Sequence, residues 1–176
     1  MVVNSRETFE RLYREHAGRV KAYGLRRVGS EAAADDVVSD VFLVAWRRLD
    51  SIPNDPLPWL LGVARNSIAN RHRHERRTTA LHARIADTER PPVADPPGPD
   101  DLLGSDDLVV RALAQLPASD RELLMLVAWE GLEPAQLARV LGISRGTANV
   151  RLHRARRRLA TALAADRLQQ LQEVTK

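Results

Sequence analysis

Apolar residues recur every three or four positions along most of this chain, which is the spacing of amphipathic α-helices. The first such pattern, in residues 7–28, includes Leu12 and Val20. Gly29 is expected to end this helix, and Ser30 is suited to cap the N-terminus of the next one. No segment alternates with the period of two that marks a half-buried strand. The pattern therefore predicts an all-α protein.

The second predicted helix, residues 31–49, has an apolar stripe on one side only. This stripe, which is expected to face a core, consists of Ala34, Val38, Val41, Ala45 and Leu49. A turn-rich connection then leads to a third helix, which has Pro58 in its first turn and becomes basic after Ile68. Because asparagine lowers helix propensity in this run, we expect a local break near residues 65–67.

Further helices are predicted nearer the C-terminus, at residues 106–116, 117–131, 133–142 and 144–160. Ser119 and Glu122 have the spacing of a capping box. Gly142 is expected to end the third of these helices, and Ser144 to cap the fourth. A short helix, a tight turn and a longer helix in this order indicate a helix-turn-helix.

The segment between the two groups of helices differs in composition. Residues 87–107 hold five of the ten prolines, seven acids and one arginine. Proline and acidic residues without apolar periodicity predict a flexible, extended linker. We therefore expect two small helical domains, at residues 1–85 and 107–176, joined by an acidic, Pro-rich linker at residues 86–106.

Charge adds a functional expectation to this organisation. The formal net charge is +4, but it is unevenly distributed. Residues 65–84 carry six arginines and one acid, and residues 139–158 carry seven arginines and no acid. Two basic blocks separated by an acidic one indicate two contacts with nucleic acid.

The second basic block combines a core-facing stripe with a polar outer surface. The stripe consists of Ala148, Leu152, Ala155 and Leu159. The rest of the helix is suited to a DNA major groove, through Arg145, Thr147, Asn149, Val150, Arg151, His153, Arg154 and Arg157. Asn149 is suited to adenine, Val150 to a thymine methyl group, and Arg154 and Arg157 to guanine or phosphate. The alternative is a solvated basic helix whose arginines only complement the helix dipole.

The first basic block has the composition of a contact for unpaired nucleic acid. Its candidate residues are Arg65, Asn66, Asn70, Arg71 and Arg73. His72 and His74 suggest a metal site at first, but residues two positions apart do not share a helix face. The chain also has no cysteine. We therefore expect neither a metal nor another cofactor.

The helix at residues 31–49 also has a surface that suggests a protein partner. Opposite its apolar stripe lie Asp36, Ser39, Asp40, Leu43 and Arg47, with Trp46 at the edge. A leucine beside a tryptophan and surrounded by charges resembles a small interface hot spot with a polar rim.

Other classes of protein are disfavoured. The first residues mix acids and bases, so they do not form a signal peptide. No stretch reaches the ~18 apolar residues of a membrane span. There is no Gly-rich phosphate loop and no nucleophile with a spaced histidine and acid. We expect a non-enzymatic protein that acts in the cytoplasm without membrane insertion.

Three segments together resemble the extracytoplasmic-function (ECF, group IV) sigma factors of bacterial RNA polymerase. "DDVVSDVFLVAWRRL" resembles the family's region 2.2, and "PWLLGVARNSIANRHRHERR" resembles regions 2.3 and 2.4. Residues 116–159, which end in "GTANVRLHRARRRL", resemble region 4. The three segments occur in the order that the family shows, and they cover both predicted domains.

The resemblance implies a role for each surface. The face with Leu43 would dock on the β′ clamp helices of core RNA polymerase, and region 4 would meet the β flap. Asn66 matches an asparagine that captures a flipped minus-10 base, and the helix at 144–160 would read the minus-35 element. The family also implies an anti-sigma factor that masks both domains.

We therefore expect an alternative sigma factor that directs promoter-specific transcription initiation. A conventional helix-turn-helix regulator is the first alternative, and it would share the second domain but would not bind polymerase in this way. A nucleic-acid-processing enzyme is the second alternative, and it would require a metal or acid cluster that the sequence lacks.

Overall fold

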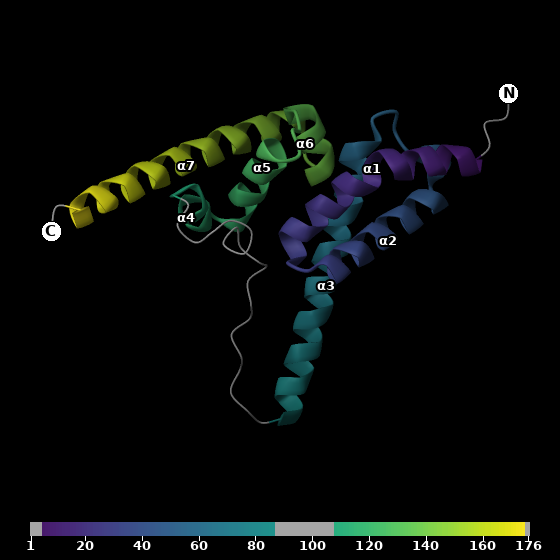
Figure 1. The fold of residues 1–176 in the computed structure, drawn as a ribbon, viewed down its shortest axis with the longest axis horizontal. Coiled ribbons are helices and arrows are strands. Elements are labelled where there is room, and N and C mark those ends of the chain that lie inside the picture. Colours follow the sequence, from purple (N-terminus) through teal and green to yellow (C-terminus); the bar gives the residue numbers. More distant parts are fainter. Residues whose placement is uncertain (1–4, 87–107, 175–176) are drawn as a thin grey trace. The chain divides into compact units, whose positions relative to one another are not determined.

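The computed structural model describes residues 5–86 and 108–174, and every regular element in these ranges is a helix (Figure 1). The elements are α1 (Ser5–Val28), α2 (Glu31–Arg47), the short 3₁₀ helix η1 (Leu49–Ser51), α3 (Pro56–Ala86), α4 (Leu108–Ala114), α5 (Ala118–Ala128), α6 (Pro134–Leu141) and α7 (Arg145–Val174). The all-α prediction is confirmed.

The chain separates into two compact units, Met1–Pro97 and Gly98–Lys176. The predicted flexible linker, residues 86–106, lies outside the described residues except for Ala86, which ends α3. The exact domain limits at residues 85 and 107 stay predictions.

The first unit is built from α1, α2 and α3, each of which packs against the other two. The fully buried side chains at its centre include Val20, Tyr23, Val37, Val41, Leu60 and Leu61. Of the stripe predicted for α2, Ala34, Val38, Val41 and Ala45 are buried as expected. Val37 and Phe42 are buried as well. Since α2 contacts helices on both sides, its buried surface is wider than one narrow stripe.

Of two local predictions for this unit, one is confirmed and the other is wrong. Ser30 caps α2 as predicted, because its Oγ accepts a hydrogen bond from the backbone N–H of Ala33 at 3.3 Å. The break predicted near residues 65–67 is wrong, because α3 continues through them. Ala64 and Ile68 are buried one turn apart, so packing of this face outweighs the low helix propensity of the asparagines.

The second unit consists of α4 to α7, and α7 contacts each of the other three helices. Its core contains Val110, Leu113, Leu123, Leu126, Leu137, Ala148, Leu152 and Ala155. The predicted capping box of Ser119 and Glu122 is wrong, because α5 begins after Pro117 with no side-chain cap. A capping box occurs instead at the start of α6, where the backbone N–H of Glu133 donates to Gln136 Oε1 at 3.0 Å.

The turn between α6 and α7 has the predicted helix-turn-helix geometry. Gly142 ends α6 in the left-handed conformation, at φ 64° and ψ 35°, which favours glycine. Ser144 then caps α7 by accepting a hydrogen bond from the backbone N–H of Thr147 at 3.1 Å. These local signals fix the direction in which α7 leaves the turn.

Helix α7 is longer than the predicted helix at 144–160, because it continues to Val174 (Figure 1). Beyond residue 160 the chain has no glycine or proline to end it. Asp166 is buried on this second half, where its Oδ1 accepts a hydrogen bond from Gln115 Nε2 at 2.8 Å. Arg111 of α4 lies 3.5 Å from the other carboxylate oxygen. Polar contacts therefore hold the extended part of α7 against α4 and the residue that follows it.

Candidate nucleic-acid and partner interfaces

The first half of α7 has the two faces that its sequence predicts. Ala148, Leu152 and Ala155 are buried, and Leu159 is half-buried. The residues predicted to face a DNA groove are all exposed: Arg145, Thr147, Asn149, Val150, Arg151, His153, Arg154 and Arg157. Val150 is apolar and has 51% of its surface exposed. An apolar side chain therefore lies within a surface that is otherwise polar and basic.

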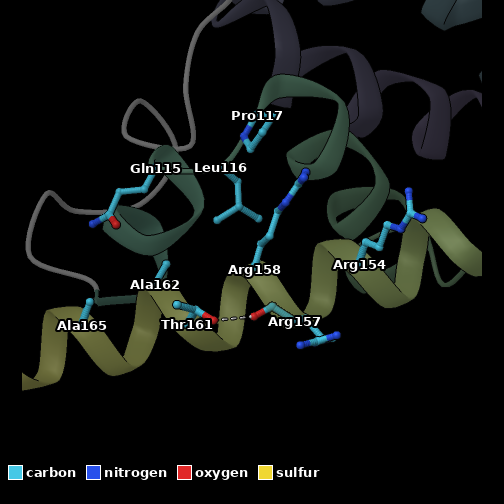
Figure 2. Close-up of a pocket in the computed structure, with 9 residues that line it drawn as sticks. All are labelled: Gln115, Leu116, Pro117, Arg154, Arg157, Arg158, Thr161, Ala162 and Ala165. Carbon is cyan, nitrogen blue, oxygen red and sulfur yellow. Dashed lines mark hydrogen bonds between the residues drawn. The ribbon is translucent and has the colours of Figure 1, made fainter.

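The arginines of α7 do not all have the same surroundings. Arg158 forms an ion pair with Asp120, which is buried in the first turn of α5. Figure 2 shows Arg158 reaching toward α5, whereas the Arg157 side chain points away from it. Arg158 therefore helps to hold α7 on α5. No local pattern predicts this pair, because its two members are 38 residues apart.

A shallow groove of about 520 Å³ lies beside this ion pair (Figure 2). Its lining combines basic and apolar groups: Gln115, Leu116, Pro117, Arg154, Arg157, Arg158, Thr161, Ala162 and Ala165. Thr161 Oγ1 donates a hydrogen bond to the backbone carbonyl of Arg157 at 3.1 Å, so this hydroxyl is used within the helix. Arg154 and Arg157 thus belong both to the groove and to the surface predicted to meet DNA.

The candidate residues of α3 lie on different sides of the helix. Arg65, Asn66, Asn70 and Arg73 are exposed. The last three lie at relative positions 0, 4 and 7, so they share one face of α3. Arg73 donates a hydrogen bond to the side-chain oxygen of Asn70, which orients that amide.

Arg71, the remaining candidate on α3, is directed toward α2. Its Nη1 donates to Asp36 Oδ2 at 3.0 Å, and its Nη2 donates to Asp40 Oδ2 at 3.2 Å. The hydrogen bond to Asp36, followed by that to Asp40, raises the pKa of Arg71 despite partial desolvation. Arg71 belongs to the first basic block by its sequence position, but the sequence does not reveal this contact with α2.

The surface of α2 that was predicted to bind a partner is exposed. Leu43 and Trp46 have 50% and 49% of their surface accessible. Asp36, Ser39 and Arg47 are exposed around them, and Asp40 is half-exposed. Large apolar side chains on a surface are common singly, but a cluster of them with a polar rim is typical of a protein interface.

Aromatic residues of α1 extend this apolar surface. The ring of Phe9 packs edge-on against Trp46, with centroids 5.1 Å apart, and Tyr13 packs against Phe42 at 4.7 Å. Tyr13 keeps 46% of its surface exposed. The sequence does not indicate that Tyr13 belongs to this surface, because only the packing of α1 on α2 brings it there.

The part of the chain that the structure describes gives no support for a metal site or a membrane-spanning helix. There, no cluster of three or more histidine, aspartate or glutamate side chains is arranged to hold a metal ion. Nor does any helix within residues 5–86 and 108–174 combine the length and apolar character needed to cross a membrane.

Comparison with known protein families finds matches in both parts of this chain. Residues 12–78 match the family description "Sigma-70 region 2", and residues 106–159 match "Sigma-70, region 4". Among curated proteins, the chain is 36% identical over 157 residues to the ECF RNA polymerase sigma factor SigL of Mycobacterium tuberculosis, covering 86% of each chain. It is 32% identical over 161 residues to the RNA polymerase sigma factor CarQ of Myxococcus xanthus, covering 90% of this chain and 91% of CarQ.

Solved structures give a consistent result. The chain is similar to the sigma factor RpoE of Bartonella quintana in its complex with the anti-sigma factor NepR, with a TM-score of 0.63 and 26% identity. That match covers 90% of this chain and 98% of RpoE. The chain is also similar to CnrH in complex with the cytosolic domain of CnrY, with a TM-score of 0.56, 28% identity and coverage of 93% and 91%.

Proposed function

This chain belongs to the ECF sigma factors, non-enzymatic alternative sigma factors that direct transcription initiation by RNA polymerase, and we propose how its surfaces divide this function. The α2 surface with Leu43 and Trp46 binds core polymerase. The exposed face of α3 holds the minus-10 strand, and the outer face of α7 reads the minus-35 duplex.

The exposed apolar surface of α2 carries the proposal for polymerase binding. A single exposed apolar side chain is common on a protein surface. Leu43, Trp46 and Tyr13 together form an apolar centre that a bound partner would shield from water. Asp36, Ser39, Asp40 and Arg47 would form the polar rim. The family's usual partner for this surface is the clamp-helix pair of the β′ subunit, and the β flap is the corresponding partner of the second unit.

Reading of the minus-35 element is assigned to α7. The predicted groove-facing residues of α7 are exposed, and a helix of this kind can enter a major groove. Asn149, Val150, His153 and Arg154 would discriminate among bases, while Arg145, Thr147, Arg151 and Arg157 would contact the DNA backbone or support base contacts. The hydroxyl of Thr147 lies 2.9 Å from that of Ser144 at the start of the helix. This position suits a phosphate better than a base edge.

Capture of the minus-10 strand is assigned to Arg65, Asn66, Asn70 and Arg73. Melting a promoter requires that unpaired bases be held, and no bond in the DNA is made or broken. Amide side chains can hydrogen-bond base edges, and arginines can follow the phosphates of a single strand. These four residues are exposed on a helix fixed by its buried face, so the strand would meet a preorganised surface.

Control by an anti-sigma factor is a further part of the proposal. The similar RpoE was solved with the anti-sigma factor NepR. The exposed apolar surface of α2 is suited to such a partner, which would compete with core polymerase for Leu43 and Trp46. Because its polymerase partner is cytoplasmic, we also propose that the chain acts in the cytoplasm.

Substitution of Leu43 by alanine tests the polymerase-binding surface. Full burial of a leucine contributes about 1.5–3 kcal/mol, and half of Leu43 is already buried in the free protein. Its contribution to binding is therefore about 1 kcal/mol, so Leu43→Ala should weaken core-polymerase affinity about fivefold. Fluorescence polarisation of labelled protein titrated with core polymerase measures this affinity.

Val150→Ala is the matched control, because Val150 is equally exposed but lies on the other unit. It should leave polymerase affinity unchanged while altering promoter binding. Unchanged polymerase affinity for both variants would remove the proposed role of the α2 surface. Complete failure of the wild-type chain to bind polymerase or to start transcription would instead support a conventional helix-turn-helix regulator.

A further inference from the structure

Arg71 joins α3 to the partner-binding surface of α2. Its two Nη atoms bind Asp36 and Asp40, which lie one helical turn apart on α2. Ser67, one turn before Arg71 on α3, also donates to Asp40 Oδ2 at 2.6 Å. The same carboxylate oxygen of Asp40 therefore accepts hydrogen bonds from two residues of α3.

The orientation of α3 separates Arg71 from the face assigned to the minus-10 strand. Asn66, Asn70 and Arg73 share one face, whereas Ser67 and Arg71 are four residues apart and share another. Relative to Asn66, Arg71 is rotated by about 140° around the helix at about 100° per residue. The Arg71 side chain is only 33% exposed, and its Nε atom is buried without a hydrogen-bond partner. This guanidinium faces α2.

Asp36 and Asp40 are like charges at positions i and i+4, an arrangement that destabilises a helix when nothing neutralises it. A planar guanidinium can bind both carboxylates at once, whereas the ammonium group of lysine acts as a single point charge. Arg71 therefore both neutralises the pair and fixes the direction of the two side chains. The side chains of Asp36 and Asp40 are still 64% and 48% exposed, so a partner can reach them.

We propose that Arg71 is a positioning residue for polymerase binding, holding Asp36 and Asp40 in the arrangement that core polymerase meets, and that it does not contact the minus-10 strand. This inference rests on the proposed function of the α2 surface. Arg71 therefore acts on polymerase binding through Asp36 and Asp40, although it belongs to the basic block of α3. The Arg71 side chain also connects α3, which has the proposed minus-10 surface on another face, to the proposed polymerase-binding surface of α2.

The test compares Arg71→Ala, Arg71→Lys and Arg73→Ala in the full-length protein. Two affinities are measured: that of the protein for core polymerase, and that of saturated holoenzyme for a single-stranded minus-10 oligonucleotide. Arg71→Ala and Arg71→Lys should both weaken polymerase binding, by about three- to tenfold for the alanine variant, with strand binding unchanged. Arg73→Ala should do the reverse. A thermal melt shows whether each variant is folded at the assay temperature.

A double-mutant cycle separates positioning from general stability. In a background with Asp36→Asn and Asp40→Asn, Arg71→Ala should have no further effect on polymerase affinity, because the pair that it positions is gone. An additive effect in this background would overturn the proposal. The proposal would also be overturned if Arg71→Lys kept wild-type polymerase affinity, or if Arg71→Ala weakened strand binding alone.

Leu43→Ala distinguishes failure of this inference from failure of the proposed function. If Leu43→Ala weakens polymerase binding and Arg71→Ala does not, only the role of Arg71 is wrong. If neither substitution changes polymerase affinity, the α2 surface is not the polymerase-binding surface, and both proposals fail.

Discussion

Val150 offers the sharpest test of the proposed reading of DNA by α7, because the contribution proposed for it depends on one methyl group of the DNA. Val150 is 51% exposed in the folded protein. Full burial of a valine side chain contributes about 1.5–3 kcal/mol, so covering the exposed half in a groove contributes about 1 kcal/mol. Val150→Ala should therefore weaken binding to a site with a matching thymine about three- to fivefold.

The assay measures binding of holoenzyme to promoter duplexes in which each minus-35 thymine is replaced in turn by uracil. Uracil lacks the C5 methyl group and keeps every hydrogen-bonding atom of thymine. Wild-type protein should lose affinity at one such position. Val150→Ala should bind that thymine duplex and its uracil counterpart equally well, because the apolar contact has already been removed.

Two results would refute this reasoning. If Val150→Ala weakens binding to all duplexes equally, Val150 shapes the helix or its surroundings and does not read a base. If the variant stays as sensitive to the uracil replacement as the wild type, another side chain contacts the methyl group. Asn149→Ala is a useful comparison, because its loss should depend on an adenine and not on a thymine methyl group.

Two other substitutions test further proposed contacts with nucleic acid. Asn66→Ala should reduce open-complex formation, followed by permanganate reactivity of unpaired thymines, more than it reduces polymerase affinity; equal losses in both would contradict base capture. Arg154→Ala should cost about 1–3 kcal/mol at one minus-35 position in a competition assay with single-base promoter variants. A uniform loss across all the variants would instead identify Arg154 as a phosphate contact.

The parts of the fold that depend on neighbours in sequence were predictable. Ser30, Gly142 and Ser144 act locally, so each was recognised from its residue type and position, and the structure confirms all three. The buried stripe of α7 was also predictable, since its period follows directly from helix geometry. For the same reason, the exposure of Leu43 and Val150 could be expected from the pattern alone.

The errors have physical causes of a different kind. The asparagines of α3 predicted a break, but burial of Ala64 and Ile68 in the core keeps the helix continuous. Ser119 had the right neighbours for a capping box, yet α5 begins after Pro117 and leaves Ser119 inside the helix. In α3, a local preference of less than about 2 kcal/mol is outweighed by the packing of Ala64 and Ile68.

The contacts that connect helices could not be predicted from the chain alone. Arg71 with Asp36 and Asp40, and Arg158 with Asp120, join residues 31 to 38 positions apart. An arginine-rich helix offers many equivalent donors, so no sequence pattern selects the one that turns toward a neighbouring helix. Composition predicted that these blocks bind nucleic acid, and only the fold shows which arginines contact a neighbouring helix.

The uninterrupted length of α7 has a mechanical consequence. Val150 and Asp166, whose carboxylate accepts a hydrogen bond from Gln115, lie on one helix, about 24 Å apart at 1.5 Å per residue. A partner that tilted α7 by about 5° around its Asp166 end would move Val150 by about 2 Å, roughly half the separation of two carbon atoms in contact. Ala148, Leu152 and Ala155 are buried against the other helices of this unit, so such a tilt would carry the whole second unit with it. A partner that rotated the second unit by about 5° would therefore shift the proposed DNA-reading face without touching the DNA.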